Sequence, residues 1–227
     1  MRAEYFTGVT YKGSYASADD CPSSAAIPIL AFTGRSNSGK SSLLSSLCRH
    51  ANLARTSKKA GKTRTLNYFS VPPSSSGGPG LYLVDLPGYG YAALSLTERE
   101  QIRHMVDEYL ASVKNVKLLI IVLDARREPG PEENSIRAWC DMHAQPHVFA
   151  LTKWDKLGNK ERAAALKFWN AWGSPFVFVS NETGYGVEKL LYKVRNTVRR
   201  PDELPPDVIS VSSDSGADFD DASEDDA

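Results

Sequence analysis

The chain has 227 residues, of which 41% are hydrophobic, 10% aromatic and 24% charged. This composition provides enough apolar surface for one filled core, and no apolar run approaches the roughly 18 to 20 residues that a membrane-spanning helix requires. We therefore expect a soluble intracellular protein without integral membrane association. The three cysteines are an odd number without CxxC spacing, so neither a disulfide scaffold nor a zinc ribbon is indicated.

The formal net charge of zero hides an asymmetry along the chain. Residues 201–227 carry ten acidic side chains and no Lys or Arg, which leaves 27 basic and 17 acidic side chains, a net charge of +10, in residues 1–200. A basic body attracts polyanions, whereas an acidic, Ser-rich segment has too few apolar residues to order itself. We predict an N-terminal extension at residues 1–27, a folded domain at residues 28–200 and a disordered acidic tail at residues 201–227.

Apolar runs alternate with amphipathic segments, which is typical of an α/β domain. A Pro-, Ser- and Gly-rich stretch at residues 72–80 predicts a hairpin loop between two of the strands. Strands that alternate with helices predict a three-layer fold with a mostly parallel sheet of about six strands. The expected strands are residues 29–33, 66–71, 81–84, 116–123, 148–151 and 176–179, and the expected helices are residues 40–49, 96–113, 132–143, 159–172 and 187–198.

The segment at residues 34–41 (GRSNSGKS) has the P-loop spacing GxxxxGK[ST], and it lies between an expected strand and an expected helix. Its glycines allow main-chain N–H groups to point at phosphates, Lys40 supplies a positive charge, and Ser41 offers a hydroxyl to Mg²⁺. This loop alone does not distinguish ATP from GTP. The residues that we assign to phosphate binding here are Gly34, Arg35, Ser36, Asn37, Ser38, Gly39, Lys40, Ser41 and Ser42.

A second phosphate motif, residues 85–88 (DLPG), begins where the expected strand 81–84 ends. Open α/β sheets place ligands at that end of a strand. Asp85 can hold a metal ion through a water, and the Gly88 N–H can reach a terminal phosphate. An isolated DxxG would predict only a turn, but its position after a P-loop favours a phosphate site.

Two later segments indicate the nucleotide base. In residues 152–155 (TKWD), the Asp155 carboxylate can accept hydrogen bonds from N1–H and the 2-amino group of guanine, whereas adenine has an acceptor and no amino group there. This favours GTP over ATP, with Thr152 and Lys153 in the same base site. The turn at residues 180–186 (SNETGYG) could contact the guanine O6 through its main chain, although a helix-start turn explains it nearly as well. Its assigned residues are Val179, Ser180 and Asn181.

With these motifs in order, the sequence resembles the Era-like GTPases and, within them, the EngB family of ribosome-assembly GTPases, over about residues 5–200. The resemblance lies in residues 31–42 (AFTGRSNSGKSS), 56–63 (TSKKAGKT), 83–92 (LVDLPGYGYA) and 152–155. Three features depart from the family pattern. Ala60 stands where proline is usual, Asn181 stands where a small residue is commoner, and the loop at residues 72–80 is longer.

The resemblance implies a GTPase that hydrolyses GTP to GDP and phosphate with Mg²⁺ as cofactor. It implies a monomer that binds a precursor of the large ribosomal subunit through rRNA and ribosomal proteins, in a bacterial cytoplasm or an organelle matrix. In the basic loop at residues 55–64, which carries five Lys and Arg side chains, Gly61, Lys62 and Thr63 are implied to bind nucleotide. By the same resemblance Lys40, Thr63 and Gly88 carry catalysis, and Ser41, Thr63 and Asp85 hold the metal ion.

Two residues bear on the rate of hydrolysis. Tyr89 stands where Ras-type GTPases carry a water-orienting glutamine, so we expect slow hydrolysis and a switch function. Asn37 resembles the asparagine that binds K⁺ in related GTPases, and a purely structural role in the loop is the alternative. Tyr89 and Tyr91 either join the basic loop in an RNA surface or pack on helix 96–113. The alternative function is a nucleotide-gated protein-interaction module in cell division or signalling.

Overall fold

The computed structural model describes residues 5–22, 27–49, 65–73, 80–89 and 95–198. In this part of the chain seven strands form one sheet in the order β1-β3-β4-β2-β5-β6-β7. The strands are β1 (Thr10–Tyr15), β2 (Ile29–Gly34), β3 (Leu66–Val71), β4 (Leu81–Asp85), β5 (Val116–Asp124), β6 (His147–Thr152) and β7 (Phe176–Phe178). The helices are α1 (Lys40–Cys48), α3 (Leu96–Ser112), α4 (Pro131–Met142), α5 (Asn159–Trp172) and α6 (Val187–Val198), with a 3₁₀ turn at Trp154–Lys156.

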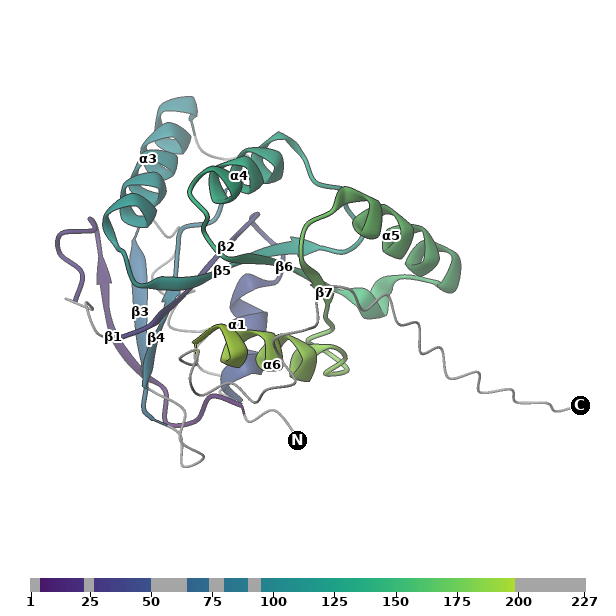
Figure 1. The fold of residues 1–227 in the computed structure, drawn as a ribbon, viewed down its shortest axis with the longest axis horizontal. Helices are drawn as coiled ribbons and strands as arrows, with labels where there is room; N and C mark the ends of the chain where they lie inside the picture. The colour runs from purple at the N-terminus through teal and green to yellow at the C-terminus, as the bar shows by residue number, and fades with distance from the viewer. Residues whose placement is uncertain (1–4, 23–26, 50–64, 74–79, 90–94, 199–227) are drawn as a thin grey trace, which may run out of the picture.

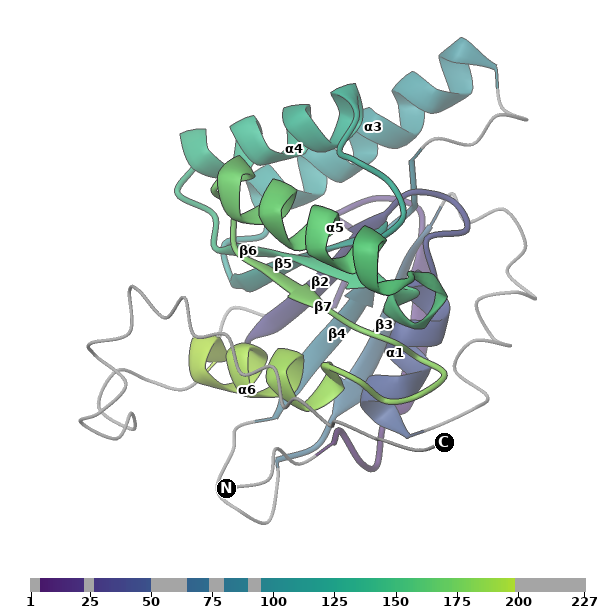
Figure 2. The same cartoon turned by 90° about the vertical axis from the view of Figure 1, so that its right-hand side faces the viewer.

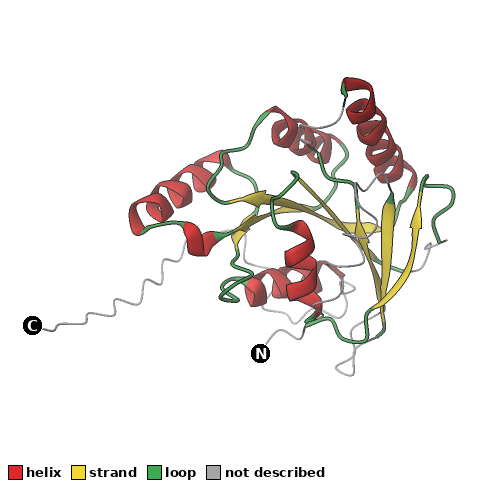
Figure 3. Ribbon diagram, turned by 180° about the vertical axis from the view of Figure 1, so that it is seen from behind, coloured by secondary structure: helices red, strands yellow, loops and turns green. Residues whose placement is uncertain are grey.

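The sheet is mostly parallel, as the alternation of strands and helices predicts. Strands β4, β2, β5, β6 and β7 run parallel to one another, and β3 pairs antiparallel with β4 as the expected hairpin. Helices α3, α4 and α5 cover one face of the sheet, and α1 and α6 cover the other (Figures 1 and 2). The same three layers are seen from behind in Figure 3. The predicted three-layer α/β fold is confirmed.

The two faces of the sheet carry separate cores. On one face Leu43 of α1 and Leu190 of α6 pack with Leu30 and Phe32 of β2. On the other face Trp169 of α5 lies in a second cluster with Tyr109 of α3 and Cys140 of α4. Because both faces are covered, all six residues of β2 are buried and the strand reads as a continuous apolar run. Helix α6 packs on the sheet through one apolar face, and its buried residues are Val187, Leu190, Leu191, Val194 and Val198.

Strand β1 was not expected. It pairs antiparallel with β3, so the sheet has seven strands in the described residues where six were predicted. Phe6, just before it, is 4% exposed and donates its N–H to the carbonyl of Leu47 at 2.9 Å. Residues 5–15 therefore pack on the domain, and a boundary at residue 28 leaves out one strand of its sheet.

The topology gathers the sequence motifs at one edge of the sheet. The carboxyl ends of parallel strands meet at the same edge, so the segments after β2, β4, β5 and β6 lie beside one another. Among the described helices none is both long and apolar enough to cross a membrane. Several sequence predictions fall outside the described residues: those for Gly61, Lys62, Thr63, Tyr91 and the tail at residues 201–227.

Candidate nucleotide-binding site

The loop after β2 has the backbone of a phosphate cradle. Gly34 lies against β5, and a Cβ there would stand 2.4 Å from the carbonyl oxygen of Val122, so a side chain would displace the strand. Gly39 has a left-handed φ of 91° and precedes α1, which has no side-chain cap and no acidic residue in its first turn. A helix start without a side-chain cap or an acidic residue is typical of a site that binds an anion. The hydroxyl of Ser38 is also buried and has no hydrogen-bond partner among the residues that the structure describes.

Lys40 and Asp85 meet at the phosphate end of the site, as the two phosphate motifs predict. Lys40 Nζ forms an ion pair with the Asp85 carboxylate and donates to the Leu86 carbonyl at 2.8 Å. The Asp85 side chain is 2% exposed, and Lys40 is its ion-pair partner among the described residues. Ser41 follows Lys40 in the first turn of α1. A carboxylate and a hydroxyl are hard oxygen donors, which fit Mg²⁺.

Metal ligation by protein groups alone is not supported at this site. Among the described residues no group of three or more His, Cys, Asp or Glu side chains is placed to hold a metal ion. Mg²⁺ usually takes one or two carboxylates and completes its shell with water and phosphate oxygens. The donor set at Asp85 and Ser41 agrees with that mode of binding.

The segment after β4 is joined to the phosphate loop through its main chain. The N–H of Tyr89 donates to the Gly34 carbonyl at 3.1 Å, and the N–H of Ser36 donates to the Tyr89 carbonyl at 2.9 Å. Gly88, immediately before, is buried. The hydroxyl of Tyr89 is buried, and this burial, together with the neighbouring Glu133 of α4, raises the pKa of Tyr89 well above its usual value. The Tyr89 hydroxyl therefore lies beside α4.

The base end of the site is built around Asp155. Its carboxylate accepts a hydrogen bond from the Ser180 hydroxyl at 2.6 Å and lies 3.2 Å from Lys156 Nζ. The hydrogen bond from Ser180 is the main influence that lowers the pKa of Asp155, and Lys156 adds to it. The Asp155 side chain is 13% exposed. A fixed, ionised carboxylate of this kind suits an acceptor for two N–H donors.

The turn after β7 supports this carboxylate. Ser180 donates its N–H to the Tyr185 carbonyl at 2.9 Å, which closes the turn. Val179 is fully buried, and its carbonyl accepts the N–H of Trp154 at 3.2 Å, so its contribution is to hold the segment around Asp155. Asn181 points at the phosphate loop, because its Nδ2 lies 3.6 Å from the position of a Cβ on Gly39. The Oδ1 of Asn181 is buried without a hydrogen-bond partner.

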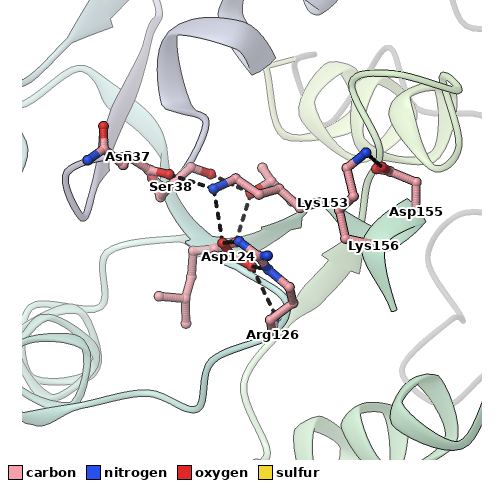
Figure 4. Close-up of polar contacts among 9 residues, drawn as sticks. Asn37, Ser38, Asp124, Arg126, Lys153, Asp155 and Lys156 are labelled. Atoms are coloured by element: carbon pink, nitrogen blue, oxygen red, sulfur yellow. Dashed lines mark hydrogen bonds and ion pairs between the residues drawn. The ribbon is translucent and has the colours of Figure 1, made fainter. Parts of the chain in front are cut away.

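Thr152 and Lys153 link the base end to the phosphate loop. The Thr152 hydroxyl donates to the Ser38 carbonyl, and Lys153 Nζ donates to the Asn37 carbonyl at 2.8 Å. Figure 4 shows Lys153 reaching between the phosphate loop and Asp124, while Asp155 pairs separately with Lys156. The sequence analysis assigned Thr152 and Lys153 to the base site, and their polar contacts in the structure are with the phosphate loop and, for Lys153, with Asp124.

Asp124 and Arg126 are the site residues that the sequence analysis missed. They follow β5 directly, and the Asp124 carboxylate contacts both Arg126 and Lys153. An acidic residue at the carboxyl end of a buried strand was the signal that identified Asp85 and Asp155. The same signal was present at Asp124.

Comparison with known proteins assigns the family. A sequence model of the family described as 50S ribosome-binding GTPase matches residues 29–153. The chain is 39% identical over 178 residues to the probable GTP-binding protein EngB of Leuconostoc mesenteroides, covering 75% of this chain and 88% of that protein. It is 37% identical over 191 residues to the probable GTP-binding protein EngB of Chlorobaculum parvum, covering 83% and 96%. The chain belongs to the EngB family of GTP-binding proteins.

Solved structures agree with this EngB assignment at the level of the fold. The crystal structure of a probable GTP-binding protein engB superposes with a TM-score of 0.62 at 22% identity, covering 75% of this chain and 98% of that one. Era bound to MgGDPNP and nucleotides 1506–1542 of 16S ribosomal RNA superposes with a TM-score of 0.59 at 19% identity, covering 80% and 60%. Membership of the EngB family, with its P-loop GTPase domain, makes this chain a GTP-binding protein and a GTPase.

Proposed function

We propose that this GTPase is a slow, nucleotide-dependent switch in assembly of the large subunit of bacterial-type ribosomes, and that it acts as a monomer. The observation that carries the proposal is the geometry of one sheet edge, where a phosphate cradle around Lys40 and Asp85 lies beside an ionised, fixed carboxylate at Asp155. The description of the matching family as 50S ribosome-binding supports the ribosomal partner. The net charge of +10 in residues 1–200 suits binding to rRNA.

In the proposed pocket, the phosphates lie on residues 34–42 and the base lies against Asp155. Main-chain N–H groups at the start of α1 and the Lys40 ammonium bind the β- and γ-phosphates. Asp155 accepts from the guanine N1–H and 2-amino group, and the turn at Ser180 and Asn181 borders the base. Among the described residues, Asn181 and Ser38 each bring a buried oxygen without a partner to this pocket, and a bound nucleotide is proposed to complete their surroundings.

Mg²⁺ fits the oxygen donors at the phosphate end, with Ser41 and Asp85 as the described residues that would hold it. Thr63, from the basic loop with Gly61 and Lys62, is proposed as a third, and it lies outside the described residues. When bound, the ion would neutralise charge on the β- and γ-phosphates.

The ion pair between Lys40 and Asp85 provides the proposed switch. A triphosphate needs Lys40 for its own oxygens, so Lys40 must leave Asp85 when GTP binds. The carboxylate of Asp85 is then free to turn toward the metal site. Because Tyr89 is hydrogen-bonded to the phosphate loop four residues after Asp85, this exchange affects the segment that presents the Gly88 N–H to the γ-phosphate.

Slow hydrolysis follows from the lack of a water-positioning side chain in this segment. The position after Gly88 is Tyr89, whose hydroxyl is buried near Glu133 and away from solvent. Positioning of the attacking water is therefore left to the main chain around Gly88 and to Thr63. A K⁺ ion at Asn37 is a further proposed contribution to the rate.

Co-sedimentation with precursors of the large ribosomal subunit tests the proposed function. With a non-hydrolysable GTP analogue the protein should sediment with the particle, and with GDP it should not. Raising the salt concentration should weaken binding steeply, because phosphate contacts release counterions. The control is Lys40→Ala, which should sediment equally little in both nucleotide states. Failure to sediment with the particle in any state, together with capture of an acidic protein partner, would favour a protein-interaction module instead.

A further inference from the structure

A charged cluster lies between the phosphate and base ends of the site. The Asp124 carboxylate accepts from Arg126 Nε at 2.9 Å, from Arg126 Nη2 at 2.7 Å and from the Arg126 N–H at 3.1 Å. Lys153 Nζ lies 3.0 Å from Oδ2 of the same carboxylate, the oxygen that also accepts from Arg126 Nη2 (Figure 4). The cluster therefore has one anion that two cations share.

The environment of Asp124 fixes it in the ionised form. Its side chain is 7% exposed, and burial alone would raise its pKa. The hydrogen bonds from Arg126 and Lys153 outweigh burial and hold the pKa of Asp124 well below its usual range. Both carboxylate oxygens are occupied, so the group has little freedom to rotate.

Lys153 connects Asp124 to the phosphate loop. Its Nζ donates to the Asn37 carbonyl at 2.8 Å while it contacts Asp124. Its backbone has a left-handed φ of 61°, and Asn37 has a left-handed φ of 64°. A residue other than glycine in the left-handed region destabilises the fold by about 1 kcal/mol, and this conformation persists where surrounding contacts hold it. The contacts of Lys153 with Asp124 and Asn37 are such contacts.

We propose that Asp124, held by Arg126, is a positioning residue for nucleotide binding. Asp124 holds Lys153 in place, and Lys153 in turn fixes the phosphate loop at Asn37. This sets the position of the phosphate loop relative to Asp155, the carboxylate proposed to bind the base, which lies two residues after Lys153. The inference rests on the proposed pocket at residues 34–42 and Asp155. Because Lys153 bridges parts of the pocket that GDP and GTP share, Asp124 acts on the affinity for both nucleotides and not on the chemical step.

The test replaces Asp124 with asparagine, which keeps the shape of the side chain and removes its charge. Calorimetry with GDP and with a non-hydrolysable GTP analogue should show both dissociation constants raised about ten- to hundredfold, while kcat at saturating GTP stays unchanged. The matched control is Asp141→Asn on α4, an aspartate whose side chain is 60% exposed and pairs with Arg137 at 3.7 Å. This control should bind like the wild type.

A double-mutant cycle separates positioning from general stabilisation. In a Lys153→Met background, Asp124→Asn should cause no further loss of affinity, because the side chain through which Asp124 acts is gone. Additive losses, or an Asp124→Asn protein that binds both nucleotides like Asp141→Asn, would overturn the inference. If Asp124→Asn does not fold, Arg126→Gln takes its place, since Arg126 is 49% exposed, and a smaller loss of affinity with the same cycle is expected.

The wild-type protein distinguishes failure of this inference from failure of the proposed pocket. If the wild type binds neither GDP nor the GTP analogue, the pocket itself is wrong. If the wild type binds both and Asp124→Asn binds them equally well, only the positioning role of Asp124 is wrong.

Discussion

Replacement of Asp155 by asparagine tests directly whether this carboxylate binds the guanine base. The carboxylate is fixed by Ser180 at 2.6 Å and Lys156 at 3.2 Å, and the amide can keep one acceptor oxygen in the same place. The variant loses the charge and one of two acceptors for the guanine N1–H and 2-amino group. Hydrogen bonds to charged groups contribute about 1.5–3 kcal/mol each. We therefore expect GDP affinity to fall by about 2–4 kcal/mol, or roughly 30- to 1000-fold.

The same substitution should improve binding of xanthosine diphosphate. Xanthine has a carbonyl in place of the 2-amino group of guanine, and the asparagine amide can donate to it where a carboxylate would repel it. Calorimetry with GDP and with xanthosine diphosphate measures the change in nucleotide preference. The matched control is Glu182→Gln in the turn after β7, because Glu182 is an exposed carboxylate beside the same site. If Asp155→Asn binds GDP with a dissociation constant within about threefold of the wild-type value, Asp155 does not bind the base and the assignment is refuted.

Three further outcomes are expected. Because the pKa of Asp155 is lowered in the folded protein, its charge is lost only when the pH falls through that lowered pKa. GDP affinity measured by calorimetry should therefore be constant from about pH 8 to about pH 5. In Ser180→Ala the fall in GDP affinity at acid pH should begin at a higher pH, because the hydrogen bond that lowers the pKa of Asp155 is gone. If Asn37 helps to bind K⁺, GTP hydrolysis should be faster in KCl than in NaCl, whereas equal phosphate-release rates would leave Asn37 a structural role. Removal of residues 201–227, with their ten acidic side chains, should tighten RNA binding at low salt in a filter-binding assay, and unchanged affinity would show that the tail does not compete with RNA.

The central part of the fold could be predicted because its strands are buried on both faces. In β2, β5 and β6 this burial produces continuous apolar runs. Helices α5 and α6 begin and end at the predicted residues. The positions of Lys40, Asp85 and Asp155 followed from the same reasoning, because side chains after parallel strands must meet at one edge of the sheet.

Strand β1 could not be predicted in this way because it lies at the edge of the sheet. Its sequence, TYKGSY, contains a glycine and a lysine, and no residue in it is fully buried. Its conformation depends on hydrogen bonds to β3, a partner more than fifty residues away in the sequence. Local composition carries no information on such a partner.

The cluster around Asp124 was missed for a related reason. Its contact with Lys153 depends on the register of β5 and β6, which places Asp124 opposite Thr152. The side chain of Tyr89 likewise depends on where α4 packs, since Glu133 of that helix is its neighbour. Sequence patterns identified the strand ends but not which side chains would meet there.

The link between the phosphate loop and Tyr89 has a consequence for sequence variation in this protein. Both hydrogen bonds that form it are made by main-chain N–H groups, at Ser36 and at Tyr89. Many side chains could replace these two residues without disturbing that link. Proline could not, because it lacks the amide proton and would remove the donor at either position. The link itself is therefore insensitive to side-chain chemistry at these two positions and closed to one residue type.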